Sequence, residues 1–296
     1  MQKKNTHQRK NNICFFIITK VLTTLKTSIA IPDSALIDES TQLNKSRKIS
    51  IIARACAIFQ IEEIFIYHER HGENKDTKLL STILKYLETP QYFRKHLYPK
   101  MDLLKYAGVL QPLKIPSHSK ISNPKLIKSG DVRDGLVVSH KGKKFLDLGF
   151  NRLLPYFKNE KVGTRIIIQF KEGYPKLSIK EISKNDLQEY WGYKVKERGN
   201  LFSLLSSWKG NIVLTSRKGK VISSSQMKSL KNQKPLLVVF GSPERGIHDI
   251  LGSDIKKIQN YTILNFFPNQ ATETIRLEES ILGSLAILNL NQMGYI

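Results

Sequence analysis

The stretch that decides the fold is LLVVFGSPERGIHDIL, residues 236–251, in which five apolar residues run directly into a loop with two glycines. A short apolar run that ends at Gly and Pro is typical of a buried strand. Residues 211–215 (NIVLT) and 261–266 (YTILNF) have the same character, and each is followed by a polar loop. We predict three strands of an open α/β sheet, in which ligands collect beyond the carboxyl ends of the strands.

The N-terminal part of the chain alternates in a way that extends this sheet. Residues 28–32 and 63–68 are predicted strands, and the segments between and after them carry apolar residues at helical spacing. This strand–helix order indicates an α/β layer with parallel strands. The predicted helices are 41–60, 78–87, a short one opened by Pro90, 201–208 and 274–288.

The pattern changes between the two α/β halves. Short predicted strands at 135–139, 144–147, 165–170 and 177–182 are separated by Gly, Asn, Pro and Lys turns. This is an all-β module of about the size of an OB-fold barrel. We therefore divide the chain into a basic extension (1–26), one discontinuous α/β domain (27–106 and 184–296) and an inserted β module (107–183).

Basic residues concentrate in the β module. The chain has 48 Lys and Arg against 25 Asp and Glu, a net charge of +23, and residues 141–180 alone hold ten basic and three acidic residues. So many like charges repel one another in a compact fold, which favours a nucleic-acid partner. An anionic membrane as partner, or a generally Lys-rich composition with no such partner, also fits. The candidate RNA-binding residues are Lys141, Lys143, Lys144, Arg152, Lys158, Lys161 and Arg165. Aromatic residues that either stack on bases or fill the module's core are Phe145, Phe150, Tyr156, Phe157, Phe170 and Tyr174.

Other features narrow the setting. Two cysteines, Cys14 and Cys56, form no disulfide framework and no zinc pattern, which favours the cytoplasm or, in a eukaryote, the nucleus. The seven histidines lack ligand spacing, so we expect no metal, and no apolar stretch is long enough to cross a membrane. Residues 1–18 imitate a signal peptide, but Lys20 and Lys26 interrupt the apolar stretch, which argues against export. An organelle presequence stays open.

Residues 236–251, followed by NFFPNQATETIRLEESILGSLAILN at 265–289, resemble the C-terminal knot of SPOUT methyltransferases. The match is to an archaeal and eukaryotic branch whose eukaryotic member is described as an RNA uridine N3-methyltransferase. TSIAIPDSAL (27–36), IARACAIFQIEEIFIYHE (52–69), LKYLETPQYFRKHLYPK (84–100) and DLLKYAGVLQPLKIPSH (102–118) are also similar to that branch. The resemblance covers most of 27–289. It implies a Rossmann-like parallel sheet with a C-terminal trefoil knot, S-adenosyl-L-methionine (SAM) among three loops, a homodimer and an OB-like insertion that grips rRNA or tRNA.

The resemblance also assigns residues to the cofactor. Two positions depart from the pattern: residues 217–219 are Arg-Lys-Gly where the family has Glu-Arg-Gly, and Ala271 stands where glycine is usual. We expect Ala271 to cost about 1 kcal/mol if its φ is positive. For Gly241 and Gly246 we expect close backbone approach to a ligand and freedom for positive φ. The implied cofactor-binding residues are Thr215, Lys218, Gly241, Pro243, Gly246, Asn265, Phe266, Pro268, Asn269, Gln270 and Thr272.

The implied chemistry requires a cation and a proton acceptor. A uracil N3 must lose its proton before it accepts a methyl group, and a guanidinium beside the ring stabilises the resulting anion. Arg54 resembles the arginine of the first SPOUT motif, and Arg245 is the second candidate cation. Glu244 is the candidate acceptor, unless it pairs with Arg245. The alternatives are a non-catalytic RNA-binding scaffold that keeps the knot, a pure OB nucleic-acid-binding protein and a membrane-surface protein.

Overall fold

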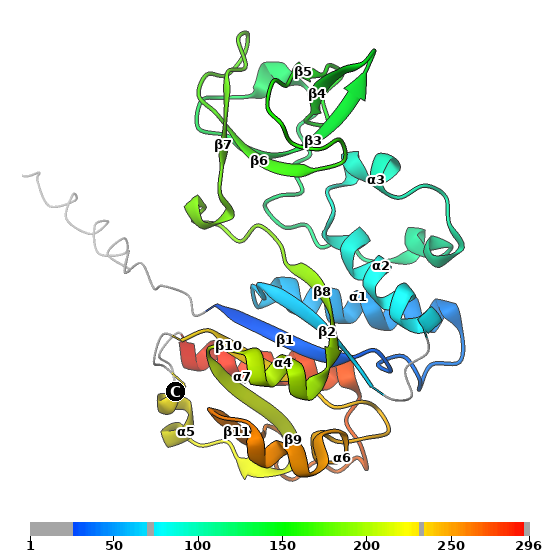
Figure 1. Ribbon diagram of the computed structural model, residues 1–296, viewed down its shortest axis with the longest axis vertical. Helices are drawn as coiled ribbons and strands as arrows, with labels where there is room; N and C mark the ends of the chain where they lie inside the picture. The colour runs from blue at the N-terminus through cyan, green and yellow to red at the C-terminus, as the bar shows by residue number, and fades with distance from the viewer. Residues whose placement is uncertain (1–25, 70–73, 231–233, 293–296) are drawn as a thin grey trace, which may run out of the picture.

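A computed structural model describes residues 26–69, 74–230 and 234–292 and contains two separate β-sheets (Figure 1). The larger sheet has six strands in the order β11-β9-β10-β1-β2-β8, and every neighbouring pair is parallel. Strands from both halves of the chain therefore share one sheet, as the sequence predicted. These strands are β1 (Thr27–Pro32), β2 (Glu63–His68), β8 (Lys194–Asn200), β9 (Asn211–Val221), β10 (Leu236–Val239) and β11 (Tyr261–Asn265).

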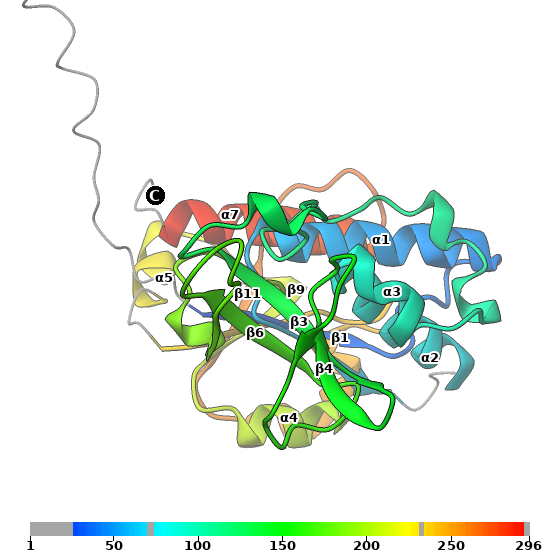
Figure 2. The same cartoon turned by 90° about the horizontal axis from the view of Figure 1, so that it is seen from above.

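Helices cover both faces of this sheet, because its central strands are apolar on both sides. On one face lie α1 (Gln42–Ile58), α2 (Asn74–Glu88), α5 (Ser224–Ser229) and α7 (Leu277–Gln292), which share a core with the strands. On the other face lie α4 (Leu201–Ser207) and α6 (Ile247–Leu251). Figure 2 shows α1 and α7 side by side on one side of the sheet and α4 on the other. The result is a three-layer α/β unit.

The inserted segment forms the second sheet. Its five strands are antiparallel, in the order β5-β4-β3-β6-β7, and they enclose a small core of their own that includes Val137, Leu146, Ile168 and Phe170. Since β5 and β7 are the two edges, the strand pairing does not close a barrel. The strands are β3 (Val132–His140), β4 (Lys143–Asp147), β5 (Leu154–Pro155), β6 (Arg165–Phe170) and β7 (Ile179–Ile182).

The passage between the two sheets is irregular. It contains α3 (Gln91–Leu97), with Pro90 as its N-cap, and several 3₁₀ turns. Leu113 and Ile115 pack into the core of the parallel sheet, whereas Ile127 packs into the core of the antiparallel sheet. The chain thus changes from one core to the other after Ile115. The 3₁₀ turns of this passage are η1 (Asp102–Leu104), η2 (Ala107–Val109) and η3 (Pro124–Leu126). Another, η4 (Lys184–Asp186), lies where the chain returns, and η5 (Gly252–Lys257) follows α6.

A few elements differ from the sequence prediction. Strand β8 was not predicted, because its sequence KVKERGN is polar and it forms the exposed edge of the sheet. Helices α5 and α6 are too short to show a helical period. The last helix begins at Leu277 and not at residue 274. The basic extension, including Cys14, lies outside the described residues except for Lys26.

Candidate active site

A hollow of about 370 Å³ lies at the carboxyl ends of β9, β10 and β11. Its volume is at the lower end of the range for small-molecule sites. All three predicted loops contribute to it, so the topology brings together segments that lie more than fifty residues apart in sequence. The predicted residues that line it are Thr215, Lys218, Gly241, Pro243, Glu244, Arg245, Gly246, Asn265, Phe266 and Gln270.

The first segment is not a simple loop after a strand. It lies inside β9, but Leu214 pairs with Ile263 and Lys220 pairs with the very next residue, Leu264. Residues 215–219 therefore leave the ladder as a bulge, and the first four of them line the hollow. Gly219 makes the bulge possible, because a Cβ there would lie 2.7 Å from the backbone carbon of Leu264.

The second segment folds back on itself. Ser242 N donates to Arg245 O at 2.9 Å, and a Cβ on Gly241 would lie 2.8 Å from that same carbonyl oxygen. Neither Gly241 nor Gly246 has a positive φ, so that part of the expectation for these glycines was wrong. Glycine is needed at 241 for close backbone contact within the loop.

The third segment corrects the expectation for Ala271. The left-handed residue in this loop is Asn269, with a φ of 63°, and Ala271 has no positive φ. Asn tolerates this conformation better than most residues, so the cost expected for Ala271 does not arise. Pro268, Asn269 and Thr272 do not line the hollow. The Thr272 carbonyl instead accepts a hydrogen bond from Gln270 Nε2 at 2.9 Å.

Hydrogen bonds from side chains to backbone carbonyls join the first and third segments. Arg217 Nη1 donates to Glu273 O at 2.8 Å, and Asn265 Nδ2 donates to Arg217 O at 3.1 Å. Gln270 also reaches Glu273 O, at 3.3 Å. The two segments therefore form one continuous wall of the hollow.

Arg245 is held by one carboxylate and one backbone carbonyl at the hollow's edge. Its Nη1 contacts Glu69 Oε1 at 3.2 Å, and its Nη2 donates to Asp249 O at 2.7 Å. Glu244 is exposed and is not its partner within the described chain, so the alternative pairing of Glu244 with Arg245 is not seen. Glu69 is 3% exposed, which makes its interaction with Arg245 a largely buried one.

The lining of the hollow fits a sulfonium-containing nucleoside amino acid such as SAM. Phe240, Leu264 and Phe266 give it an apolar wall that suits a flat base, while carboxylates and basic side chains lie around the same space. The carboxylates suit a sulfonium and an ammonium group, and the basic groups suit a carboxylate. The charged lining residues are Arg217, Lys218, Glu244, Arg245, Asp249 and Glu273.

Arg54 lies elsewhere. It is on α1 and lines a different hollow, beside Ile58, Leu113 and Tyr190. Its Nη1 donates to Pro112 O at 3.0 Å. The structure therefore does not bring Arg54 into the hollow that holds Arg245 and Glu244.

The predicted RNA-binding residues divide into two groups. Five of the seven are exposed and Lys144 is half-buried; of these six, only Lys158 has an ion pair in the described chain, with Glu181 at 3.0 Å. Arg165 differs, because its guanidinium contacts Glu88 and Asp134, each at 2.7 Å. Arg165 thus joins the insertion to α2. The five exposed residues are Lys141, Lys143, Arg152, Lys158 and Lys161.

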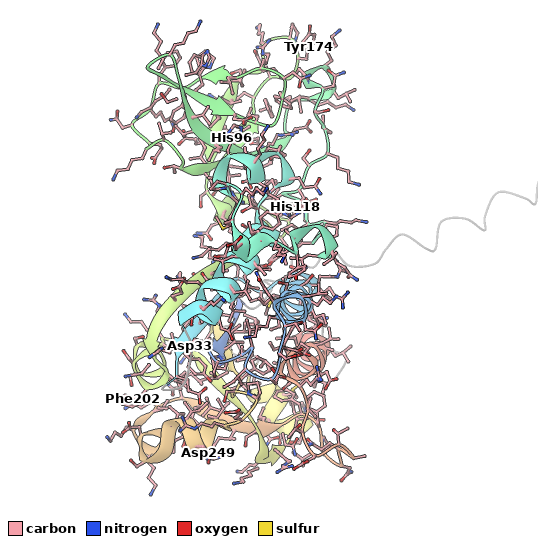
Figure 3. All side chains as sticks on the ribbon, turned by 90° about the vertical axis from the view of Figure 1, so that its right-hand side faces the viewer. Asp33, His96, His118, Tyr174, Phe202 and Asp249 are labelled. Atoms are coloured by element: carbon pink, nitrogen blue, oxygen red, sulfur yellow. The ribbon has the colours of Figure 1, made fainter. Side chains whose placement is uncertain are left out.

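The aromatic residues of the insertion also divide. Phe150, Tyr156 and Phe170 belong to its core. Phe157 is 93% exposed and precedes Lys158, and Tyr174 is 47% exposed at the end of the insertion farthest from the parallel sheet (Figure 3). Half of the six aromatics therefore fill the core, Phe145 is half-buried beside His140, and Phe157 and Tyr174 are free to contact a ligand.

Sequence reasoning missed a second polar group at the same edge of the sheet. His68 Nδ1 lies 2.6 Å from Asp33 Oδ2, and Glu69 N donates to Asp33 Oδ1 at 2.9 Å. Ser34 Oγ donates to Glu69 Oε2. A signal was present in the sequence, because Asp33 and Glu69 follow predicted strands of the parallel sheet, where ligands collect.

Three simpler expectations concern reactivity and setting. Cys56 is fully buried, and burial raises the pKa of its thiol, so this cysteine belongs to the core. Within residues 26–69, 74–230 and 234–292, no group of three or more His, Cys, Asp or Glu side chains could hold a metal ion. The helices of that same part of the chain are all too short or too polar to span a membrane.

Comparisons with known proteins agree with the resemblance found in the sequence. A family model described as "Putative RNA methyltransferase" matches residues 26–288. A 28S rRNA (uridine-N(3))-methyltransferase of Homo sapiens is 30% identical over 298 residues, which cover 88% of this chain and 77% of the human protein. The corresponding protein of Drosophila melanogaster is 28% identical and covers 88% of this chain and 61% of its own length. An uncharacterized protein of Halobacterium salinarum is 27% identical over 90% of this chain and 99% of its own.

Proposed function

The chain belongs to this family and is an RNA methyltransferase, and we propose that it methylates N3 of a uridine in rRNA with SAM as methyl donor. The observation that carries the cofactor assignment is the single hollow that all three predicted segments line. The relatives named uridine-N3 methyltransferases support the choice of base. We further propose that the C-terminal part of the parallel sheet is the trefoil knot of the SPOUT class.

The residues of the hollow would bind and orient the donor. When bound, SAM supplies an electrophilic methyl group. The apolar wall at Phe240 and Phe266 would take its base, and the bulge at 215–219 would close over it. Most of the rate acceleration would come from alignment of donor and acceptor, because a methyl transfer requires the reacting atoms in line.

Arg245 is our candidate for the cation beside the reacting ring. Removal of the N3 proton leaves negative charge on the ring and its oxygens, and a fixed guanidinium stabilises that charge. Arg245 is fixed, since Glu69 and the Asp249 carbonyl hold two of its nitrogens. It also lines the hollow, where the acceptor ring must approach.

Arg54 enters this scheme through a second protomer. It lies on the same face of α1 as Ile51 and Ile58, which are 47% and 56% exposed. Leu282 on the adjacent α7 is 43% exposed. We propose that this apolar face is the homodimer interface, and that Arg54 reaches the methyl-transfer site of the partner protomer.

The insertion would grip the RNA. Its exposed lysines attract phosphates, and Phe157 offers a face for base stacking. We propose an OB-like module that begins after the parallel-sheet core, with RNA contact as its role. The division of the chain given by the sequence (27–106, 107–183 and 184–296) is part of this proposal, except that the segment up to Ile115 belongs to the parallel-sheet core. So is a cytoplasmic or nuclear location.

One experiment tests the reaction directly. Purified protein is incubated with SAM labelled in its methyl group and with total RNA, and the modified nucleoside is identified by mass spectrometry. We expect labelled 3-methyluridine in large rRNA. A non-catalytic scaffold would bind RNA and leave every nucleoside unlabelled, and calorimetry would then show no heat with SAM.

A further inference from the structure

The His68 and Asp33 pair has the geometry of an oriented base. The Nδ1–Oδ2 distance is 2.6 Å, the imidazole side chain is 62% exposed, and the Asp33 carboxylate is 3% exposed. A buried carboxylate at this distance holds the proton on Nδ1 and leaves Nε2 as a proton acceptor. In the described part of the chain nothing bonds to Nε2. The Asp33 carboxylate is itself fixed by the backbone N–H of Glu69.

This pair lies at the same edge of the sheet as the proposed cofactor site. Pro32 is level with Tyr67 and Ala30 with Val239, so β10, β1 and β2 end at the same edge of the sheet. Asp33 comes directly after β1, His68 ends β2, and Ser242 lies in the loop that follows β10. Because neighbouring strands are about 5 Å apart, the carboxyl end of β2 lies on the order of 10 Å from that of β10, two positions along the sheet.

Hydrogen bonds join the pair to the wall of the hollow. Glu69, whose backbone binds Asp33, accepts from Ser34 and contacts Arg245 at 3.2 Å and Ser242 Oγ at 3.4 Å. Ser242 and Arg245 both line the hollow. A base and a cation are thus held by one network of buried carboxylates.

The strand order places His68 on the route of an RNA. The order β11-β9-β10-β1-β2-β8 runs from the hollow at one side to β8 at the other, and the insertion stands beyond β8 (Figure 1). Strand β2, which ends in His68, lies between them. A nucleotide chain that extends from the insertion to the hollow along the carboxyl edge passes this imidazole.

From this geometry we propose that His68, oriented by Asp33, is the general base that removes the N3 proton of the target uracil, and that Glu69 positions Arg245 beside the anion. This rests on the proposed function. Nε2 accepts the proton, the N–H bonding pair stays on N3 and attacks the methyl carbon, and the sulfur keeps the pair of the broken C–S bond. The imidazolium then returns its proton to water. Glu244, the acceptor expected from sequence, is exposed, and within the described chain no hydrogen bond orients it.

The first experiment compares His68→Gln with His96→Gln. His96 is a matched control, because it is 57% exposed and its Nε2 lies near a carboxylate, Asp147, but at 3.6 Å, beyond hydrogen-bond distance. For His68→Gln we expect kcat to fall at least about a hundredfold, with SAM affinity and RNA affinity unchanged. We expect wild-type kcat for His96→Gln. The RNA is the oligonucleotide that spans the nucleotide methylated by the wild-type protein.

The second experiment uses 5-fluorouridine at the target position, whose N3–H is more acidic than that of uridine. The kcat defect of His68→Gln should shrink on this RNA, since an acidic N3–H depends less on a base. Without any methyl donor, ¹⁹F NMR should detect the ionised ring bound to wild-type protein and the neutral ring bound to the variant. Asp33→Asn should resemble His68→Gln in both measurements, provided that its circular dichroism is that of the wild type.

The outcomes separate the two proposals. If the wild-type protein labels no RNA, the proposed function fails. If the wild-type protein is active and His68→Gln keeps its kcat, only the role of His68 fails. An equal defect on uridine and 5-fluorouridine, or a loss confined to RNA affinity, also rejects the base and leaves His68 as a structural or binding residue.

Discussion

The two sheets of this protein use their charged residues in opposite ways. At the carboxyl edge of the parallel sheet, Arg245, Glu69 and Asp33 are held by one another and by backbone groups. On the antiparallel insertion, Lys141 and Lys143 stand in solvent without an ion pair in the described chain. One region fixes the geometry of a few groups, and the other exposes unpaired positive charge to solvent. Substitutions at the edge should therefore act steeply, while those on the insertion should act gradually and depend on salt.

The largest expected effect is a loss of methyl transfer. It tests whether one protomer supplies every residue of the reaction site. Arg54→Ala and Arg245→Ala should each lose methyl transfer while SAM still binds. If Arg54 acts across a dimer, mixing the two inactive proteins should restore about a quarter of wild-type turnover, because half of the dimers are mixed and each has one intact site. No recovery in a mixture that exchanges protomers would place Arg54 outside the partner's site.

The next largest effect is a loss of SAM affinity. It tests whether the loop at Gly241, at the carboxyl edge of the parallel sheet, must keep its shape. Gly241→Leu should weaken SAM binding by about 3 kcal/mol or more, because a side chain at 241 collides with the Arg245 carbonyl and opens the loop. Calorimetric titration with SAM measures this. Gly108→Ala is the control, since a Cβ there meets nothing within 4 Å. Normal affinity in Gly241→Leu would show that the donor binds elsewhere.

Arg165 lies on the insertion but is held by ion pairs, as the charged residues at the edge of the parallel sheet are. The sequence predicted that Arg165 binds RNA. The structure instead predicts that Arg165→Ala lowers the free energy of unfolding by about 3 kcal/mol, because Glu88 and Asp134 stay buried without this guanidinium. Urea unfolding checks this value. Lys161→Ala should leave stability unchanged, and a large loss there would contradict the division of charges drawn above.

Phe157 tests whether the insertion contacts bases as well as phosphates. Phe157→Ala should weaken RNA binding by about 1–2 kcal/mol, because one stacking surface is lost. Its thermal stability should not change, since the ring is 93% exposed. Phe170→Ala should show the reverse, with lower stability from the loss of a core ring. Filter binding and calorimetry distinguish the two.

The smallest effect is that of single lysines. Lys143→Gln should reduce the log–log slope of RNA affinity against salt by about 0.7 if its ammonium contacts one phosphate of a single strand. The slope, measured at several salt concentrations, is more informative than one affinity. SAM affinity should not respond. An unchanged slope for Lys141, Lys143 and Lys161 together would mean that RNA binds another face.

Sequence alone predicted the parallel sheet well and the site in part. Apolar runs such as LLVVF identify buried strands, because a strand covered on both faces must be apolar throughout. Strand β8 carries no such run, since it forms an exposed edge. The bulge at 215–219 depends on pairing with β11, and pairing between distant strands leaves no local period in sequence.

The predicted roles of single residues were less reliable for a similar reason. Arg165 and Lys161 look alike in a basic segment, and only the position of Glu88, 77 residues away, separates a buried ion pair from a free charge. Likewise, Asp33 and His68 lie 35 residues apart and meet only because β1 and β2 are neighbours. Composition predicts the overall charge of a segment, whereas the roles of individual side chains require the fold.

The ion pairs of Arg165 have one more consequence. Glu88 ends α2, Asp134 lies at the start of the antiparallel sheet, and Trp191 Nε1 donates to Asp134 at 2.9 Å where the chain returns. Both segments that connect the two sheets are therefore joined by contacts at one buried cluster of side chains. The carboxyl edge of the parallel sheet and the exposed lysines of the insertion are thus held at a fixed separation, and an RNA that contacts both would have to span it.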